Sequence, residues 1–180
     1  MMEDKIELVP LQNDDLEQFV SDNQEAFNYG AIKEFGLRDA HMEEDDQIIS
    51  RDTILRAISE GEAYRIVKNH RKTGGAVIKT EGNKGYLSLL FVAPDSHNSG
   101  IGYAAWCAIE KLHPEVKIWQ TETPYFEKRN IHFYVNRCGF HIIEFYNEHH
   151  INPNEPLDIS DRTSDEQCAD EMFLFEKRIN

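Results

Sequence analysis

The sequence predicts an α+β fold built on a mostly antiparallel sheet. Two helical patterns come early, three strand patterns joined by short turns follow, and strands and helices alternate over the rest of the chain. Hydrophobic residues make up 40% of the 180 residues, which is enough for one core, so we expect a single domain over residues 1–180. The predicted order is β-α-α-β-β-β-α-β-α-β-β.

The first part of the chain contains one strand and two helices. Residues 6–9 alternate weakly between apolar and polar and predict a short strand. Apolar residues recur at helical spacing over residues 13–27, with Asn13 as the expected N-cap. A break over residues 30–36 precedes a second helix at about residues 46–60.

Three strands come next, because the apolar period changes to two near residue 63. They are predicted over residues 63–67, 76–79 and 86–92. Residues 72–75 and 81–85 are rich in turn-forming types and are expected to join these strands as antiparallel hairpins.

The last part alternates helices and strands. Helical spacing predicts helices over residues 101–112 and 131–138, and Gly139 suits the left-handed residue that ends the second helix. The remaining strands are predicted over residues 116–121, 140–146 and 172–175.

The formal net charge of −14 is concentrated at the two ends of the chain. Residues 1–50 carry −11, residues 51–150 carry +2 and residues 151–180 carry −5. Nucleic acid is therefore not an expected partner, because phosphate backbones need a clustered basic surface. An acidic start without a leader, three cysteines and no apolar run of ~20 residues predict a cytoplasmic protein with no membrane partner. The eight histidines show no metal-ligand spacing, so no metal is expected.

Residues 91–102, FVAPDSHNSGIG, carry the clearest chemical signal. A predicted strand runs into a proline-marked loop, and Gly100 and Gly102 open the following helix. Glycines let a backbone approach a ligand closely, and the N–H groups of a first helical turn attract phosphate. The segment predicts an anion site that needs no basic side chain.

A dinucleotide-binding motif is one alternative for this segment. Residues 100–105 fit Gly-x-Gly-x-x-Ala, and Glu122 follows about twenty residues later. That motif, however, opens almost directly from its strand within alternating βαβ units. Here seven residues separate Val92 from Gly100, and hairpin-linked strands come before it.

The same segment resembles the acetyl-CoA signature of the GNAT N-acetyltransferases, Gln/Arg-x-x-Gly-x-Gly/Ala, which reads HNSGIG over residues 97–102. Residues 130–140, NIHFYVNRCGF, are similar to the family's second signature. The close resemblance covers residues 86–146. It implies an α/β/α sandwich whose central sheet is splayed between the fourth and fifth strands.

The resemblance implies acetyl-CoA as cosubstrate, with its pyrophosphate on backbone N–H groups and its pantetheine arm along the third strand of the hairpins. Tyr134 would be the general acid that protonates the departing CoA thiolate. The implied cofactor contacts are Leu90, Phe91, Val92, His97, Asn98, Ser99, Gly100, Ile101, Gly102 and Asn130.

Two residues depart from the family pattern. His97 replaces the Gln or Arg that starts the loop. Tyr134 lies five residues before Gly139, one more than expected, which leaves open whether Tyr134 or Phe133 faces the CoA thiol.

The general base is not evident, since the predicted strand over residues 86–92 holds no carboxylate. Glu122, at the end of a predicted strand, is the first candidate. Glu34 and His41 come next, and Glu144 is either a surface residue or part of the acceptor site.

The leading hypothesis is an N-acetyltransferase that works by direct attack of a primary amine in a ternary complex. In this fold the acidic segments flank the acceptor side, which suggests a cationic small molecule or a peptide amine; alternatively these acids only aid solubility. The alternatives are a non-catalytic acyl-CoA sensor of the same fold and a nicotinamide-dependent enzyme. The sequence leaves open whether the protein forms a homodimer.

Overall fold

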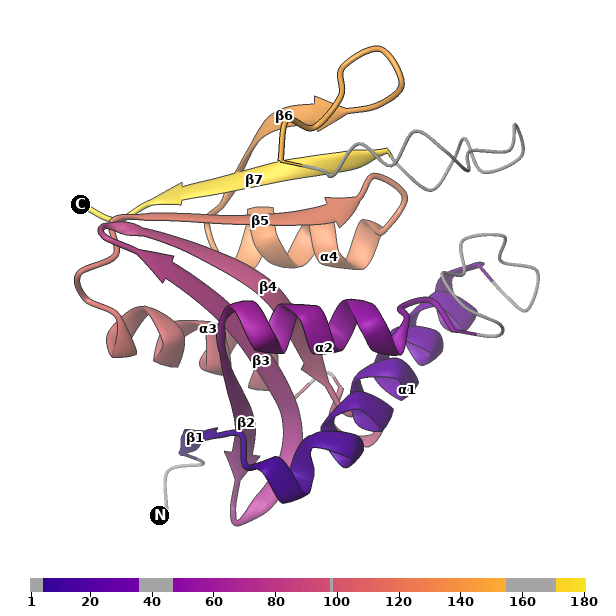
Figure 1. The fold of residues 1–180 in the computed structure, drawn as a ribbon, viewed down its shortest axis with the longest axis vertical. Helices are drawn as coiled ribbons and strands as arrows, with labels where there is room; N and C mark the ends of the chain where they lie inside the picture. Colours follow the sequence, from indigo (N-terminus) through magenta and orange to yellow (C-terminus); the bar gives the residue numbers. More distant parts are fainter. Residues whose placement is uncertain (1–4, 36–46, 98, 155–170) are drawn as a thin grey trace. The chain divides into compact units, whose positions relative to one another are not determined.

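The computed structural model describes residues 5–35, 47–97, 99–154 and 171–180 (Figure 1). The chain divides into two compact units, Met1–Lys117 and Ile118–Asn180. The single domain expected over residues 1–180 stays a prediction, as does the splay expected between the fourth and fifth strands.

The N-terminal unit is built on antiparallel strands in the order β1-β2-β3-β4. Their bounds are Ile6–Pro10 for β1, Glu62–Lys68 for β2, Arg71–Glu81 for β3 and Lys84–Val92 for β4. The antiparallel hairpins that the sequence predicts are therefore confirmed, although β3 is much longer than residues 76–79.

The first hairpin turn is not at residues 72–75, as predicted. Gly74 and Gly75 lie inside β3, and the turn is made by Asn69 and His70, with left-handed φ angles of 50° and 63°. The reason is packing, because a Cβ on Gly74 would lie 2.1 Å from the carbonyl oxygen of Phe91. These glycines allow close approach of neighbours and do not turn the chain.

Helices cover both faces of this sheet (Figure 1). They are α1 (Leu16–Phe35), α2 (Arg51–Glu60) and α3 (Ile101–Leu112). Leu89 and Phe91 of β4 pack with α1 and α2 residues, whereas Leu90 and Val92 pack with α3 residues. Alternate side chains of one strand thus enter two cores, and the α/β/α layering is present within this unit.

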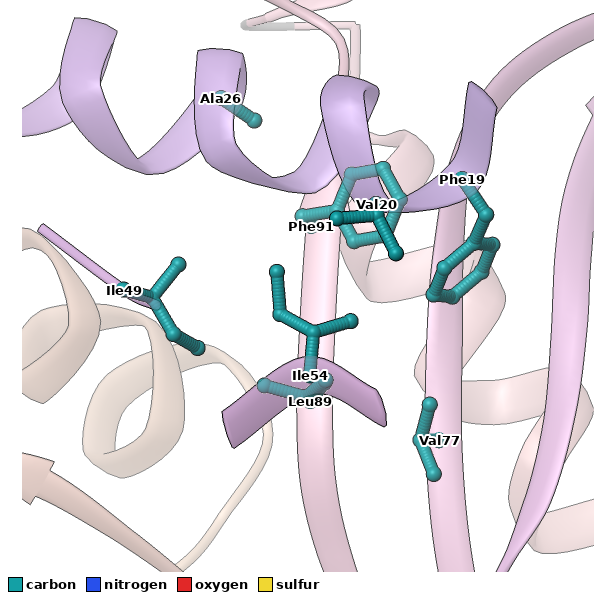
Figure 2. Close-up of a cluster of buried hydrophobic side chains, with 8 residues drawn as sticks. All are labelled: Phe19, Val20, Ala26, Ile49, Ile54, Val77, Leu89 and Phe91. Atoms are coloured by element: carbon teal, nitrogen blue, oxygen red, sulfur yellow. The ribbon is translucent and has the colours of Figure 1, made fainter. Parts of the chain in front are cut away.

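Figure 2 shows the core under α1, in which Phe19 meets Phe91 edge to face at 5.1 Å between ring centroids. Ile54 of α2 and Val77 of β3 are fully buried in the same cluster. This core anchors the end of β4, from which the loop before α3 departs.

Three predicted helix ends are wrong in the N-terminal unit. Asn13 is not an N-cap, because residues Asn13–Asp15 form a 3₁₀ turn and α1 begins at Leu16. The break predicted over residues 30–36 does not occur before Phe35, since α1 continues through Gly30. Residues 36–46 lie outside the described part. The second helix starts five residues later than expected, because Ser50 caps it by accepting a hydrogen bond from the Thr53 N–H at 3.1 Å.

The C-terminal unit holds antiparallel strands in the order β5-β7-β6. Its elements are β5 (Ile118–Pro124), α4 (Lys128–His132), a π turn (Phe133–Arg137), β6 (His141–Tyr146) and β7 (Met172–Arg178). Gly139 has the predicted left-handed conformation, with φ of 81°. Strand β5 starts two residues later and ends three residues later than predicted.

Across both units, no helix in the described ranges is long and apolar enough to cross a membrane.

Candidate functional site

The loop between β4 and α3 has the geometry that an anion site needs. A 3₁₀ turn over Pro94–Ser96 follows β4, and Gly100 precedes α3 with a left-handed φ of 75°. A Cβ on Gly100 would meet nothing within 4 Å, so the glycine is required by its backbone angle and not by lack of space. The first N–H groups of α3 have no partner within the helix and point out of its N-terminus.

Hydrogen bonds fix this loop in place. The Ala93 N–H donates to the Thr73 carbonyl at 2.8 Å, and the Ser96 N–H donates to the Ala93 carbonyl at 2.9 Å. The Ser99 hydroxyl donates to the Ser96 carbonyl at 2.5 Å. Arg71 of β3 forms an ion pair with Asp95. The loop is therefore preorganised around the α3 N-terminus; Asn98, one of the predicted contacts, lies outside the described residues.

His97, which stands where the family pattern has Gln or Arg, folds back on the strand. Its Nε2 lies 2.8 Å from the Val92 carbonyl oxygen, and its ring meets the ring of Tyr29 at 5.3 Å. The side chain therefore joins the loop to the last residue of β4. This is a role in shaping the loop, and a direct contact of His97 with the cofactor stays a prediction.

The extra residue between Tyr134 and Gly139 is absorbed by the π turn. The Cys138 N–H donates to the carbonyl five residues earlier, on Phe133, at 3.0 Å. Insertions of this kind are found within α-helices, often at functional sites. The π turn buries Tyr134, which is 7% exposed, whereas Phe133 is only half-buried.

Aromatic packing and one hydrogen bond hold Tyr134. Its ring lies 5.6 Å from the ring of Phe140 and 5.5 Å from that of Phe175, and its side chain is hydrogen-bonded to Thr121 of β5. Burial raises the pKa of Tyr134 well above its usual range, more than the Thr121 hydrogen bond lowers it. The phenol is therefore protonated at neutral pH.

Glu122 lies on the face of β5 opposite to Thr121, the partner of Tyr134, since adjacent residues of a strand point to opposite faces. Asn152 Nδ2 donates to both carboxylate oxygens of Glu122, at 3.2 and 3.3 Å. Asn152 is itself buried and accepts from the Asn154 N–H at 3.0 Å. Tyr134 is bonded to Thr121, and Glu122 is the next residue of β5. The two predicted catalytic residues therefore lie on opposite faces of that strand.

Sequence reasoning missed the groups around Glu122. Tyr146 is 6% exposed, and its pKa is raised by burial and then by the charges of Glu122 and Glu144. Its ring stacks on His150, whose Nε2 lies 2.8 Å from a Glu144 carboxylate oxygen. No spacing rule could have found Asn152, which comes thirty residues after Glu122 from a polar connection.

The remaining predicted site residues are Asn130, Glu34 and His41. Asn130 Nδ2 donates to the Thr123 hydroxyl at 3.1 Å, which ties the start of α4 to β5. The Glu34 side chain and His41 lie outside the described residues. Over the described ranges, no group of three or more His, Cys, Asp or Glu side chains is placed to hold a metal ion.

The family model described as the Acetyltransferase (GNAT) family matches residues 18–140. A curated relative, the uncharacterized protein YrkN of Bacillus subtilis strain 168, is 43% identical over 155 residues, which is 84% of this chain and 82% of that protein.

Solved structures share the fold at low sequence identity. The ribosomal-protein-S18-alanine N-acetyltransferase of Escherichia coli matches with a TM-score of 0.65 at 15% identity, covering 98% of this chain and 95% of that one. A GNAT family acetyltransferase of Elizabethkingia anophelis with acetyl-CoA bound matches at 0.64 and 16%, covering 98% and 100%. The PaiA N-acetyltransferase of Thermoplasma acidophilum in complex with coenzyme A also matches at 0.64 and 16%, covering 97% and 99%.

Proposed function

This chain belongs to the GNAT acetyltransferase family, and we propose that it transfers an acetyl group from acetyl-CoA to a primary amine by direct attack in a ternary complex. The observation that carries this proposal is the preorganised loop before α3, with Gly100 in a left-handed conformation inside the matched range. Acetyl-CoA is the acetyl donor of the family.

The β4–α3 loop suits the pyrophosphate of CoA. The N–H groups at the start of α3 supply hydrogen-bond donors and the positive end of the helix dipole. This arrangement needs no lysine, which fits a chain with a formal net charge of −14. The residues proposed to hold the cosubstrate are Leu90, Phe91, Val92, His97, Asn98, Ser99, Gly100, Ile101, Gly102 and Asn130.

Tyr134 is proposed as the general acid. A thiolate leaves when the amine attacks the thioester, and a neutral phenol can protonate it. The Tyr134 phenol carries its proton throughout the neutral range, because burial raises its pKa from an ordinary value that is already alkaline. The π turn supports Tyr134 over Phe133, because it turns the phenol toward β5 and buries it there.

Glu122 is proposed as the general base, which takes a proton from the acceptor ammonium so that the free amine can attack the thioester. It faces away from Tyr134 across β5, so the two proton transfers take place on opposite faces of that strand. Such a division separates the proton removed from the amine from the proton given to the thiolate. Asn152 positions the Glu122 carboxylate through its two hydrogen bonds.

The acceptor is proposed to be a cationic small molecule or a peptide amine. Glu122 and Glu144 both raise the pKa of Tyr146, so both carboxylates act on one region of the C-terminal unit. Two carboxylates beside an aromatic ring favour a cation.

The second candidate is a non-catalytic acyl-CoA sensor of the same fold. It is favoured by one observation, that β4 (Lys84–Val92) carries no carboxylate at all. Purified protein incubated with acetyl-CoA and a panel of diamines, polyamines, aminoglycosides and short peptides separates the two. Release of CoA thiol with an amine supports the enzyme, whereas CoA binding without turnover of any amine supports the sensor.

A further inference from the structure

Asn23 of α1 is a polar side chain enclosed in an apolar layer. It is 0% exposed, and neither its Nδ2 donor nor its Oδ1 acceptor has a hydrogen-bond partner among the described residues. Other buried polar side chains of this unit find partners. Arg65 Nε donates to an Asp15 carboxylate oxygen at 2.7 Å, and the Thr73 hydroxyl is bonded as well. A buried amide left unpaired destabilises a fold, so Asn23 is a candidate for a contact with a ligand.

Helical spacing places Asn23 on the face of α1 that packs against β4. Phe19, four residues before it, and Ala26, three residues after it, belong to the core cluster under α1 (Figure 2). That cluster also contains Leu89 and Phe91 of β4. Residues three and four apart share one face of a helix, so the Asn23 carboxamide lies between α1 and β4. This is the strand proposed to hold the thioester arm of acetyl-CoA.

The two ends of α1 show where along β4 the amide lies. A Cβ on Gly75 of β3 would lie 2.4 Å from the Phe19 ring. Ten residues further along the helix, the Tyr29 ring meets His97 of the loop before α3 at 5.3 Å. Asn23 comes between these two contacts, where α1 crosses the end of β4. The unpaired amide is therefore beside the proposed cosubstrate segment, which the attacking amine must also approach.

The chemistry of the amide narrows what it could bind. Asn23 has a donor and an acceptor to satisfy, so it matches a partner that offers an acceptor and a donor together. The ammonium groups of a polyamine offer donors alone and would leave Nδ2 unpaired. In an extended peptide the N–H and C=O of one residue point to the same side, as in the hydrogen-bonded pairs of an antiparallel ladder. A peptide main chain can therefore pair with both atoms.

We propose that Asn23 selects a peptide as the acetyl acceptor, by pairing its carboxamide with the peptide main chain. The inference rests on the proposed function and narrows its acceptor to a peptide amine. Because Asn23 is fully enclosed, α1 moves away from β4 when the peptide enters, and the structure shows the closed state. The unpaired amide weakens the closed packing, which lowers the free energy needed for that movement.

The test compares wild type with Asn23→Leu, which keeps a side chain of similar size and removes the amide. Wild type is incubated with acetyl-CoA and, separately, a random tetrapeptide library with free amines, spermidine or kanamycin, and release of CoA thiol is measured. Wild type should prefer peptides. With the peptide acetylated best, Asn23→Leu should raise KM about tenfold or more and leave kcat and the Kd for CoA unchanged. Its urea midpoint should rise, because an unpaired buried amide is gone.

Val20→Ala is the matched control. Val20 is 4% exposed on the same face of α1 and has no polar group. It should lower the urea midpoint through lost packing and keep the wild-type KM. An equal rise of the peptide KM in Val20→Ala and Asn23→Leu would show an effect of packing and overturn the proposal.

Three further outcomes have distinct meanings. An unchanged peptide KM in Asn23→Leu overturns the inference, and so does a lower urea midpoint, because the amide would then have a partner in the folded protein such as a buried water. A wild-type preference for spermidine or kanamycin over every peptide also overturns it and leaves the proposed function intact. Binding of CoA without turnover of any amine overturns the proposed function, and this inference with it.

Discussion

Tyr134 is buried, its pKa is raised by that burial, and its packing makes a clean substitution available. Phenylalanine keeps the ring contacts with Phe140 and Phe175 and removes only the hydroxyl. We expect Tyr134→Phe to lower kcat by about 10²–10⁴, the range for a general acid, and to leave the Kd for CoA unchanged. Phe133→Leu is the control. Phe133→Leu should keep its activity, and full activity in Tyr134→Phe would show that the phenol does not protonate the thiolate.

Glu122 can be tested through the protonation of the acceptor. Glu122→Gln should lower kcat by about 10² or more at neutral pH, because a general base is lost. The deficit should shrink as the pH rises toward ~10.4, the ordinary pKa of an alkyl ammonium, since the amine then arrives already deprotonated. A pH series of kcat for wild type and variant measures this.

Glu176→Gln is the matched control for Glu122→Gln. Glu176 pairs in register with Gln120 of β5 and accepts a hydrogen bond from its side chain at 3.0 Å, so it shares the polar surroundings of this part of the sheet. Its substitution should leave kcat unchanged. A deficit in Glu122→Gln that is constant with pH would mean that the carboxylate positions groups and takes no proton.

Within single elements, some glycines are needed because a neighbouring group leaves no room for a Cβ, and others have open space around them. A Cβ on Gly74 would lie 2.1 Å from the Phe91 carbonyl oxygen, whereas a Cβ on Gly30 would meet nothing within 4 Å. We expect Gly74→Ala to destabilise the protein by about 1–3 kcal/mol or more, because neither strand can move away. Gly30→Ala should stabilise it by about 0.5–1 kcal/mol through helix propensity. Urea unfolding of both variants checks the pair, and destabilisation by Gly30→Ala would contradict the helical assignment.

The different reasons for having a glycine also explain why some elements are predicted correctly from the sequence and others are not. The α3 helix is confirmed from Ile101 to Leu112 because its apolar spacing is regular and a glycine precedes it. The turn at residues 72–75 is wrong because Gly74 and Gly75 satisfy a packing need that has the same sequence signature as a turn. Local composition cannot distinguish them, since the clash involves Phe91 on another strand.

The π turn shows a second limit of pattern reasoning. The sequence shows one residue too many between Tyr134 and Gly139, and the geometry shows where it is accommodated, in the bond from Cys138 to Phe133. Periodicity assumes a constant number of residues per turn, so it cannot say which side chain faces inward after an insertion. The burial of Tyr134 follows from the π turn and could not be read from spacing.

At the scale of the whole chain, the loop proposed to bind the cosubstrate is more predictable from the sequence than the proposed acceptor site. The loop is continuous in sequence, and its glycines and proline mark it. The groups around Glu122 come from β5, β6 and the connection that follows β6, so they meet only through the fold. The part of the acidic segments over residues 1–50 and 147–171 in acceptor binding stays a prediction, and residues 36–46 and 155–170 of these segments lie outside the described residues.

Three tyrosines in different parts of the chain make the whole protein sensitive to alkali. Burial first, then the hydrogen bond and charge of Glu62, raises the pKa of Tyr64 to about 12, and burial raises the pKa values of Tyr134 and Tyr146. In the unfolded chain these phenols ionise near pH 10. Between the unfolded and folded pKa values the unfolded state binds fewer protons, so stability that is complete below about pH 10 is lost as the pH rises.

We therefore expect the urea midpoint to be level just below pH 10 and to fall above it. A tyrosine that ionises only in the unfolded state changes the free energy of unfolding by about 1.4 kcal/mol per pH unit. In Tyr134→Phe the fall above pH 10 should be shallower by about that amount, because one of the three phenols whose pKa is raised by folding is gone. Comparison of slopes, rather than of absolute stabilities, removes the packing effect of the lost hydroxyl. Identical slopes in the two proteins would mean that Tyr134 ionises alike in the folded and unfolded chains, and would contradict the raised pKa of the buried phenol.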